Sequence, residues 1–289
     1  MLFRSHELVA EMRGLIDGYK DRVLIGEIYL PVQQLMNYYG KDGNGANLPF
    51  NFQLLQCAWS AEAMAQAISD YNQALPTGAW ANWVLGNHDQ PRIASRVGVR
   101  QARVAALLLM TLPGTLTMYY GEELGMRNVP IAPDKVQDPA EKNEPGIGQG
   151  RDPERTPMPW DGSPKGGFTT GEPWLPLGEE HVLVNVEALE KDAGQMLRFY
   201  QRLIAMRREH GVLVSGTLSD VSAEGAVLRY SRSDGNERVQ VVLNMSHYAV
   251  RPKVASGVVL MGTHLERIGE RVAEMTELAA AEGIVIAID

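Results

Sequence analysis

The chain has 289 residues, of which 45% are hydrophobic and 21% charged, a composition typical of a globular protein with a large core and room for two domains. Its formal net charge of −8 disfavours binding to nucleic acid, which needs a basic surface, and suits a neutral small-molecule ligand. Cys57 is the only cysteine, which excludes an internal disulfide and a cysteine-based metal site.

The sequence predicts neither an export signal near its start nor a membrane-spanning helix. Charged residues interrupt the first 13 positions, so no apolar signal-peptide core is present there. The most apolar stretch, residues 104–120, is broken by Pro113 and Gly114 and falls short of the ~20 apolar residues that a spanning helix needs. We therefore expect a cytoplasmic protein that binds neither membranes nor nucleic acid.

The first part of the chain alternates between predicted helices and strands. Apolar spacing of a helix face and terminating Gly or Pro residues predict helices over residues 6–19, 61–74 and 100–112. Apolar runs predict strands over residues 22–28, 48–52, 81–85 and 115–119. Such alternation is typical of parallel strands joined by crossover helices.

The second part of the chain differs from the first in its composition and in its pattern of apolar residues. Residues 127–191 are rich in Pro and Gly and show no periodicity, which predicts a long functional loop. A helix is expected from Asp192, as its N-cap, to Gly211. Strands are expected over residues 226–231, 239–243 and 284–288, with a hairpin turn at Asp234-Gly235. We expect two domains, residues 1–211 and 212–289.

Polar groups follow two of the predicted strands. Glu27 ends the first strand, and His88 and Asp89 follow the third. In a (β/α) barrel the carboxyl ends of all strands open onto one face, where the chemistry takes place, so these groups should share one pocket. Glycoside hydrolysis needs such a pair of carboxyl groups, one as proton donor and one as nucleophile or base.

Five ordered motifs resemble those of a known family. These motifs are the segments Gly26–Pro31, Asn87–Asp89, Tyr119–Met126, Arg155–Asp161 and Gly167–Gly171. On these segments the chain is similar to the α-amylase superfamily of glycoside hydrolases, and within it to bacterial α-glucosidases and oligo-1,6-glucosidases. In that family these segments belong to the fifth, seventh and eighth barrel strands and the loop that follows.

The resemblance implies a particular fold and one departure from the family. It implies the C-terminal half of a (β/α)₈ TIM barrel, strands five to eight, followed by a small antiparallel β-sandwich domain. The family also has a fourth-strand motif with an arginine and the nucleophilic aspartate. No such motif precedes Val23, where Asp17 lies on a predicted helix and Asp21 precedes the strand. The chain is therefore expected to be a C-terminal fragment that lacks the nucleophile and is inactive alone.

The resemblance also implies roles for individual residues. Glu27 corresponds to the general acid/base and Asp89 to the carboxylate that stabilises the transition state. Candidate substrate-binding residues are His88, Arg92, Tyr29, Phe52, Phe168, Arg151 and Arg155.

The residues themselves leave alternatives open. Glu27 could be a solvated carboxylate at a strand end, Asn87–Asp89 could be a turn closed by Asx side chains, and Arg92 could be a surface arginine. The aromatic residues could pack in the core, which we favour for Phe50, and Arg155 could anchor its loop. Glu122 and Glu123 are expected to be structural.

We expect an α-glucosidase-like protein whose substrate is a small α-glucoside or a malto- or isomalto-oligosaccharide. The alternatives are a transglycosylase or isomerase of the trehalose-forming type, and a non-enzymatic glycosidase-like protein. No cofactor or metal is expected, because Asp152–Glu154 lacks the spacing of a calcium loop and no glycine-rich phosphate loop follows a strand. The unpaired edges of a half-barrel predict self-association.

Overall fold

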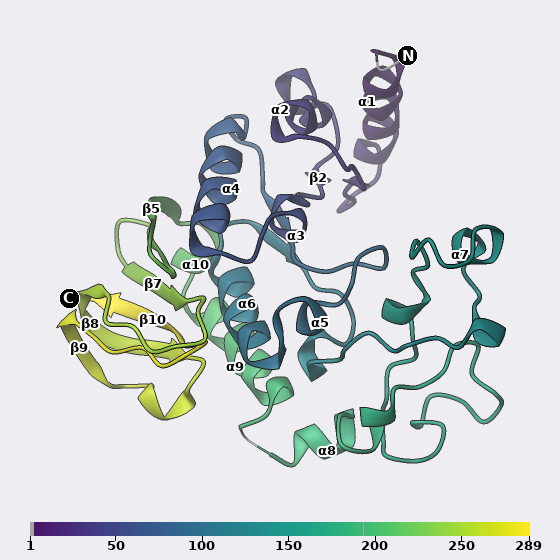
Figure 1. Cartoon of the computed structure of the whole chain (residues 1–289). Coiled ribbons are helices and arrows are strands. Elements are labelled where there is room, and N and C mark those ends of the chain that lie inside the picture. The colour runs from purple at the N-terminus through teal and green to yellow at the C-terminus, as the bar shows by residue number, and fades with distance from the viewer. Residues whose placement is uncertain (1–2, 193) are drawn as a thin grey trace.

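The computed structural model describes residues 3–192 and 194–289, and the side chains of residues 5–192 and 194–289. The elements form three regions (Figure 1): an antiparallel sheet at the C-terminus, a central set of helices, and a long loop region on the side away from the sheet. The central helices α4 (Ala61–Ala74), α6 (Val99–Thr111) and α9 (Met196–Glu209) contact strands of the sheet.

Four short strands precede the long loop, and all their pairings are parallel. Strand β1 (Ile25–Gly26) pairs with β2 (Leu48–Pro49), and β3 (Asn82–Val84) pairs with β4 (Thr115–Thr117). A parallel bridge between Asn51 and Trp83 joins the two pairs. The predicted parallel alternation is thus confirmed, although each strand is shorter than predicted. Their order agrees with four consecutive barrel strands; the half-barrel itself stays a prediction.

The helices follow from apolar spacing and from their caps. Helix α4 matches the predicted range, and the Ser60 hydroxyl caps it by accepting a hydrogen bond from the Ala63 amide at 3.2 Å. Helix α6 is buried along nearly its whole length and forms the middle of the main core. The remaining helices are α1 (Phe3–Asp17), α2 (Val32–Leu35), α3 (Gln53–Gln56), α5 (Ile93–Val97), α7 (Pro139–Asn143), α8 (Val186–Glu190) and α10 (Val212–Ser215).

The sheet after residue 216 is antiparallel, as predicted, but it is one sheet rather than a sandwich of two. Its six strands are paired in the order β5-β6-β7-β10-β8-β9. They are β5 (Thr217–Glu224), β6 (Val227–Ser233), β7 (Arg238–Asn244), β8 (Lys253–Gly262), β9 (Arg271–Met275) and β10 (Gly283–Ile288). One face packs on the central helices, and the sheet's own side chains, among them Val242, Val259 and Ile284, enclose a second apolar cluster apart from those helices.

Two arginines bind carbonyls around the end of α6, one from the sheet and one from α9. Arg232 on β6 is fully buried and donates to the carbonyls of Thr111, Leu213 and Gly216. Arg207 on α9 donates to carbonyls at the end of α6 and just beyond it. Guanidinium groups suit this place because the carbonyls at a helix C-terminus have no partner within the helix and carry partial negative charge.

One predicted helix boundary is wrong. Helix α9 begins at Met196 after Gln195, and Asp192 does not cap it. The Asp192 carboxylate instead accepts from the Gly194 amide and the Gln195 side chain, because it closes a tight turn ahead of the helix. Within residues 3–192 and 194–289, no helix is long and apolar enough to cross a membrane.

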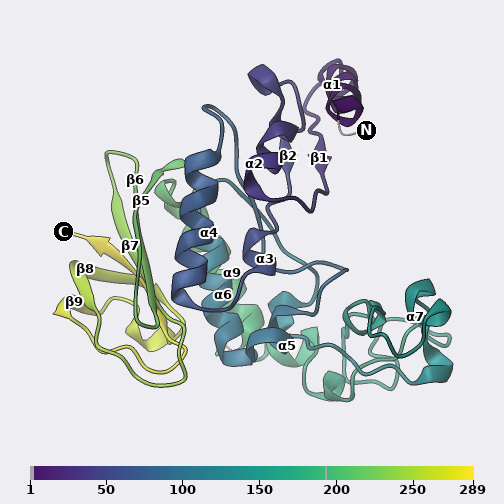
Figure 2. The same ribbon diagram turned by 45° about the horizontal axis from the view of Figure 1, so that its top comes forward.

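Apolar side chains of α1 and β1 face solvent. Figure 2 shows α1 apart from the central helices, beside β1 and β2. Leu8, Met12 and Leu15 on α1 are more than half exposed, as are Val23 and Ile25. Leu8, Met12 and Leu15 share one face of α1 by their helical spacing, and an exposed apolar face marks an interaction site or an association hazard.

We predict that the purified chain associates through this surface. Replacing Leu8, Met12 and Leu15 with Gln should lower the mean molar mass measured by light scattering during size-exclusion chromatography, because less apolar area is then removed from water on association. Met275→Gln, an exposed apolar residue of the C-terminal sheet, is the matched control and should leave the mass unchanged. A monodisperse monomer for the unsubstituted chain would contradict the prediction.

Candidate active site

The structure brings together the three polar groups that the sequence places after strands. Single ligand atoms of Glu27, His88 and Asp89 all lie within 4.8 Å of one another. Glu27 follows β1, and the other two residues lie just beyond β3. Glu27 and His88 are exposed and Asp89 is partly buried. The cluster therefore offers two carboxylates and an imidazole to a ligand at the carboxyl ends of parallel strands.

A buried acid supports the backbone ahead of this cluster. The fully buried Glu122 has a pKa raised to about 8, chiefly because burial disfavours its charged form. Its Oε1 lies where a Cβ atom on Gly86 would stand, only 2.2 Å from that position. Nearby, Arg96 donates to the carbonyl of Leu85 and to that of Leu55. A glycine is thus required at position 86 by close approach.

One oxygen of Asp89 accepts hydrogen bonds from two arginines and lies close to a histidine ring nitrogen. Asp89 Oδ1 lies 3.0 Å from Arg151 Nη1, 2.9 Å from Arg155 Nη2 and 3.3 Å from His88 Nε2. Arg155 also donates from Nε to the carbonyl of His88 at 2.8 Å. Because both arginines belong to the long loop, Asp89 joins that loop to the end of β3. Among the described residues, none donates a hydrogen bond to the other carboxylate oxygen, Oδ2.

Asp138 holds Arg151 in place, and sequence reasoning did not identify it. Its carboxylate accepts from Arg151 Nε at 2.8 Å and from the Arg151 amide at 2.9 Å. The hydrogen bond from the Arg151 side chain is the main reason that the pKa of Asp138 lies well below its usual range. Asp138 also caps α7 by accepting from the Ala140 amide. The Asp-Pro pair at 138–139 is a helix-start signal that could have revealed that cap, but not the ion pair.

Asp152–Glu154 forms a turn, as predicted, and both acids in it are buried. The carboxylate of Asp152 accepts from the amides of Gln137 and Asp138, and Glu154 accepts from the Asn128 side chain at 3.0 Å. The turn therefore fixes the segment that carries Arg151 and Arg155.

Two aromatic residues pack together beside the cluster. The Tyr29 ring stacks on that of Phe52, with centroids 4.0 Å apart and planes at 18°. Phe52 is buried in a small cluster with Phe50, Leu55 and Val84, which agrees with the core placement favoured for Phe50. Phe52 thus lies behind Tyr29, and a direct contact between Phe52 and a sugar is not open in this arrangement.

Arg92 and Phe168 lie apart from the three-residue cluster. Arg92 is only 1% exposed, so the alternative that it is a surface arginine is wrong. Its guanidinium stands over the rings of Tyr119 and Tyr120 and donates to the Tyr120 carbonyl. It could contact a substrate only by leaving this site. Phe168 is half exposed on the long loop, and no contact among the described residues links it to Glu27, His88 or Asp89.

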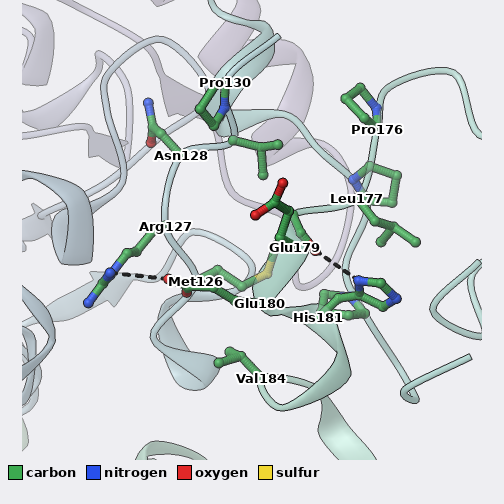
Figure 3. Close-up of a pocket in the computed structure, with 14 residues that line it drawn as sticks. Met126, Arg127, Asn128, Pro130, Pro176, Leu177, Glu179, Glu180, His181 and Val184 are labelled. Atoms are coloured by element: carbon green, nitrogen blue, oxygen red, sulfur yellow. Dashed lines mark hydrogen bonds and ion pairs between the residues drawn. The ribbon is translucent and has the colours of Figure 1, made fainter. Parts of the chain in front are cut away.

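A separate pocket lies within the long loop (Figure 3). It encloses about 530 Å³ and is lined by residues 126–130, 157, 159, 176–181 and 184. Arg127 and Glu180 form an ion pair at 3.1 Å across it, and His181 Nδ1 lies 2.8 Å from the Gly178 carbonyl. None of its lining residues belongs to the three-residue cluster, so the pocket and the cluster are distinct.

Paired carboxylates at the carboxyl ends of parallel strands are the groups that glycoside hydrolysis requires. The α-amylase catalytic-domain family, described as "Alpha amylase, catalytic domain", matches residues 3–216. The chain therefore belongs to the α-amylase family.

Curated relatives are about one-third identical to this chain over the aligned region. Maltase A1 of Drosophila melanogaster is 36% identical over 85% of this chain and 44% of its own length. A probable α-glucosidase of Rhizobium meliloti is 32% identical over 84% of this chain and 46% of its own length. The oligo-1,6-glucosidase of Parageobacillus thermoglucosidasius is 30% identical over 84% of this chain and 50% of its own length. The chain thus spans about half the length of these relatives.

Solved structures agree with the family. The α-glucosyl transfer enzyme XgtA superposes with a TM-score of 0.89 at 27% identity, covering 99% of this chain and 54% of that chain. The isomaltulose synthase SmuA from Protaminobacter rubrum gives 0.88 at 26% identity, covering 98% and 58%.

We predict that Gly86→Ala destabilises the chain by about 1–3 kcal/mol, the usual cost of forcing an extra methyl group into a packed site. The new Cβ would collide with the buried Glu122 carboxylate. Gly211→Ala is the control, because nothing lies within 4 Å of a Cβ there and its φ of −56° suits alanine. Equal midpoints of urea unfolding for the two variants would contradict this account of Gly86.

We predict that the anchoring of the loop by Asp138 weakens in acid. A carboxyl group with a lowered folded-state pKa contributes stability that is complete above its unfolded pKa of about 3.9 and is lost as the pH falls toward the folded value. Hydrogen exchange of residues 137–155, corrected for intrinsic rates, should therefore accelerate between about pH 4 and pH 2. Asp138→Asn should show fast exchange already at pH 6; unchanged exchange in that variant would rule the anchor out.

Proposed function

We propose that this chain supplies the acid/base and the transition-state-stabilising carboxylate of a retaining α-glucosidase for small gluco-oligosaccharides. The single observation that carries the proposal is the meeting of Glu27, His88 and Asp89 within 4.8 Å. The family membership and the names of the relatives support the substrate class. The location in the cytoplasm stays a prediction, and one relative is named a salivary α-glucosidase of Anopheles gambiae.

Glu27 is the proposed proton donor to the glycosidic oxygen. It is exposed at a strand end, where a bound sugar can reach it. In the second half-reaction the same group would take a proton from the attacking water. Among the described residues, its cluster contains one other carboxylate, that of Asp89.

Asp89 suits a stabilising role better than a nucleophilic one. Because Oδ1 accepts from both Arg151 and Arg155, its negative charge is already drawn toward two guanidinium groups. Such a carboxylate is a weak nucleophile but a firmly oriented acceptor for sugar hydroxyl groups. The separation of Glu27 and Asp89 is compatible with that of a retaining pair, so distance alone does not exclude Asp89 as the nucleophile.

We therefore propose that the nucleophile lies on polypeptide outside these 289 residues. The cluster holds no third carboxylate among the described residues, and each curated relative has about as much chain again beyond the matched half. A segment that pairs with the edges of β1 and β4 would close the sheet and could bring that carboxylate to Glu27.

Transfer to a sugar acceptor is a second candidate activity. XgtA is described as an α-glucosyl transfer enzyme and SmuA as an isomaltulose synthase, and both superpose on nearly all of this chain. Transfer would use the same groups and differ in what attacks the glucosyl intermediate, water or a sugar hydroxyl. Analysis of products formed from maltose would separate the two activities.

We predict no hydrolysis of p-nitrophenyl α-glucoside by the chain alone. Activity should appear when the unmatched half of the Rhizobium meliloti relative is added in trans, and Glu27→Gln should lower the complemented rate by about 10²–10⁴-fold, the usual loss on removing a general acid/base. Glu179→Gln, in the separate pocket, should leave that rate unchanged.

Turnover by the chain alone that is lost in Glu27→Gln would show that the nucleophile is already present. In that case Asp89→Asn, which is isosteric but cannot attack, would decide whether Asp89 is that nucleophile.

A further inference from the structure

Tyr29 connects the two strand ends that carry the carboxylates. It lies two residues after Glu27, and its ring is fixed by stacking on the buried Phe52. One face of the ring is therefore covered by the protein, and the side chain as a whole is 37% exposed. A ring fixed in this way can hold a residue at one strand end in a defined position relative to the other strand end.

The Tyr29 hydroxyl accepts a hydrogen bond from Asn87, the residue that precedes His88 and Asp89. The donor is the Asn87 side-chain nitrogen, and the Asn87 side-chain oxygen accepts from the Asp89 amide at 3.1 Å. Because the amide oxygen is committed to the Asp89 N–H, the nitrogen must be the end that faces Tyr29. Asn87 is buried, so it has little access to water as a substitute partner.

The phenol is held in its neutral form. Burial raises the pKa of Tyr29, the hydrogen bond from Asn87 lowers it, and the charges of Asp89 and Glu27 raise it again. The hydroxyl thus accepts from Asn87 while its own proton remains available to donate.

We propose that Tyr29 is a positioning residue, which acts through Asn87 to fix Asp89 relative to Glu27. This inference rests on the proposed function, since it assigns Tyr29 a part in placing the two carboxylates of that site. It differs from the expectation that Tyr29 contacts the substrate directly, as a surface on which a sugar ring could stack. The geometry matters because catalytic groups need to be held within about half an ångström of their productive positions.

Tyr29→Phe separates the two roles, because it keeps the ring and its stacking on Phe52 and removes only the hydroxyl. In the chain alone, hydrogen exchange of the Asp89 amide should become at least about tenfold faster, since its acceptor Asn87 is no longer held. In the complemented enzyme, kcat should fall about tenfold or more with little change in KM. Tyr248→Phe, an exposed tyrosine of the C-terminal region, is the control.

Asn87→Ala should have the same effects, and the double variant should be no worse than either single variant, because both act along one path. Unchanged Asp89 exchange and kcat in Tyr29→Phe, with KM raised only by Tyr29→Ala, would overturn the inference and return Tyr29 to a stacking role. An unsubstituted enzyme that remains inactive would count against the proposed function, whereas the exchange measurement would still decide the role of Tyr29.

Discussion

The Oδ1 atom of Asp89 joins the strand that ends in the candidate site to the long loop that follows the last parallel strand. Two guanidinium groups beside one partly buried carboxylate would leave excess positive charge, and the carboxylate of Asp138 offsets it at Arg151. Removing one member of such a network leaves the charge of another member uncompensated. The loss of one ion pair therefore weakens the remaining pairs. The position of the loop and the orientation of Asp89 are consequently one property of the fold.

Beneath this network the backbone of the site rests on buried groups. Glu122 fills the space that Gly86 leaves open, and Arg96 binds the carbonyl at the end of β3. Helix α6 and the C-terminal sheet lie in the same apolar core, so the sheet supports the helices behind the strands. Close packing therefore fixes the backbone that leads into the site, and ion pairs fix the long loop against it.

The sequence predicts the parts of this arrangement that depend on local pattern. The alternation of elements, the approximate positions of β1 and β3, and strands β6, β7 and β10 follow from apolar spacing and turn residues, whereas β5, β8 and β9 are not predicted. It does not predict contacts between distant segments, such as the pairing of Asp89 with Arg151 across 62 residues. The sequence also does not predict that Arg92 is buried against two tyrosine rings, because it shows the charge of a residue but not the side chains that surround it in the fold.

Calorimetric titration with 1-deoxynojirimycin, a glucose-shaped cation, tests most directly whether Glu27 and Asp89 form one sugar site. Paired carboxylates should bind a cation that resembles the positively charged transition state. Our account predicts that the chain binds this compound and that Glu27→Gln and Asp89→Asn each weaken binding at least about tenfold, whereas Glu179→Gln does not. Equal affinity in all four proteins would contradict it.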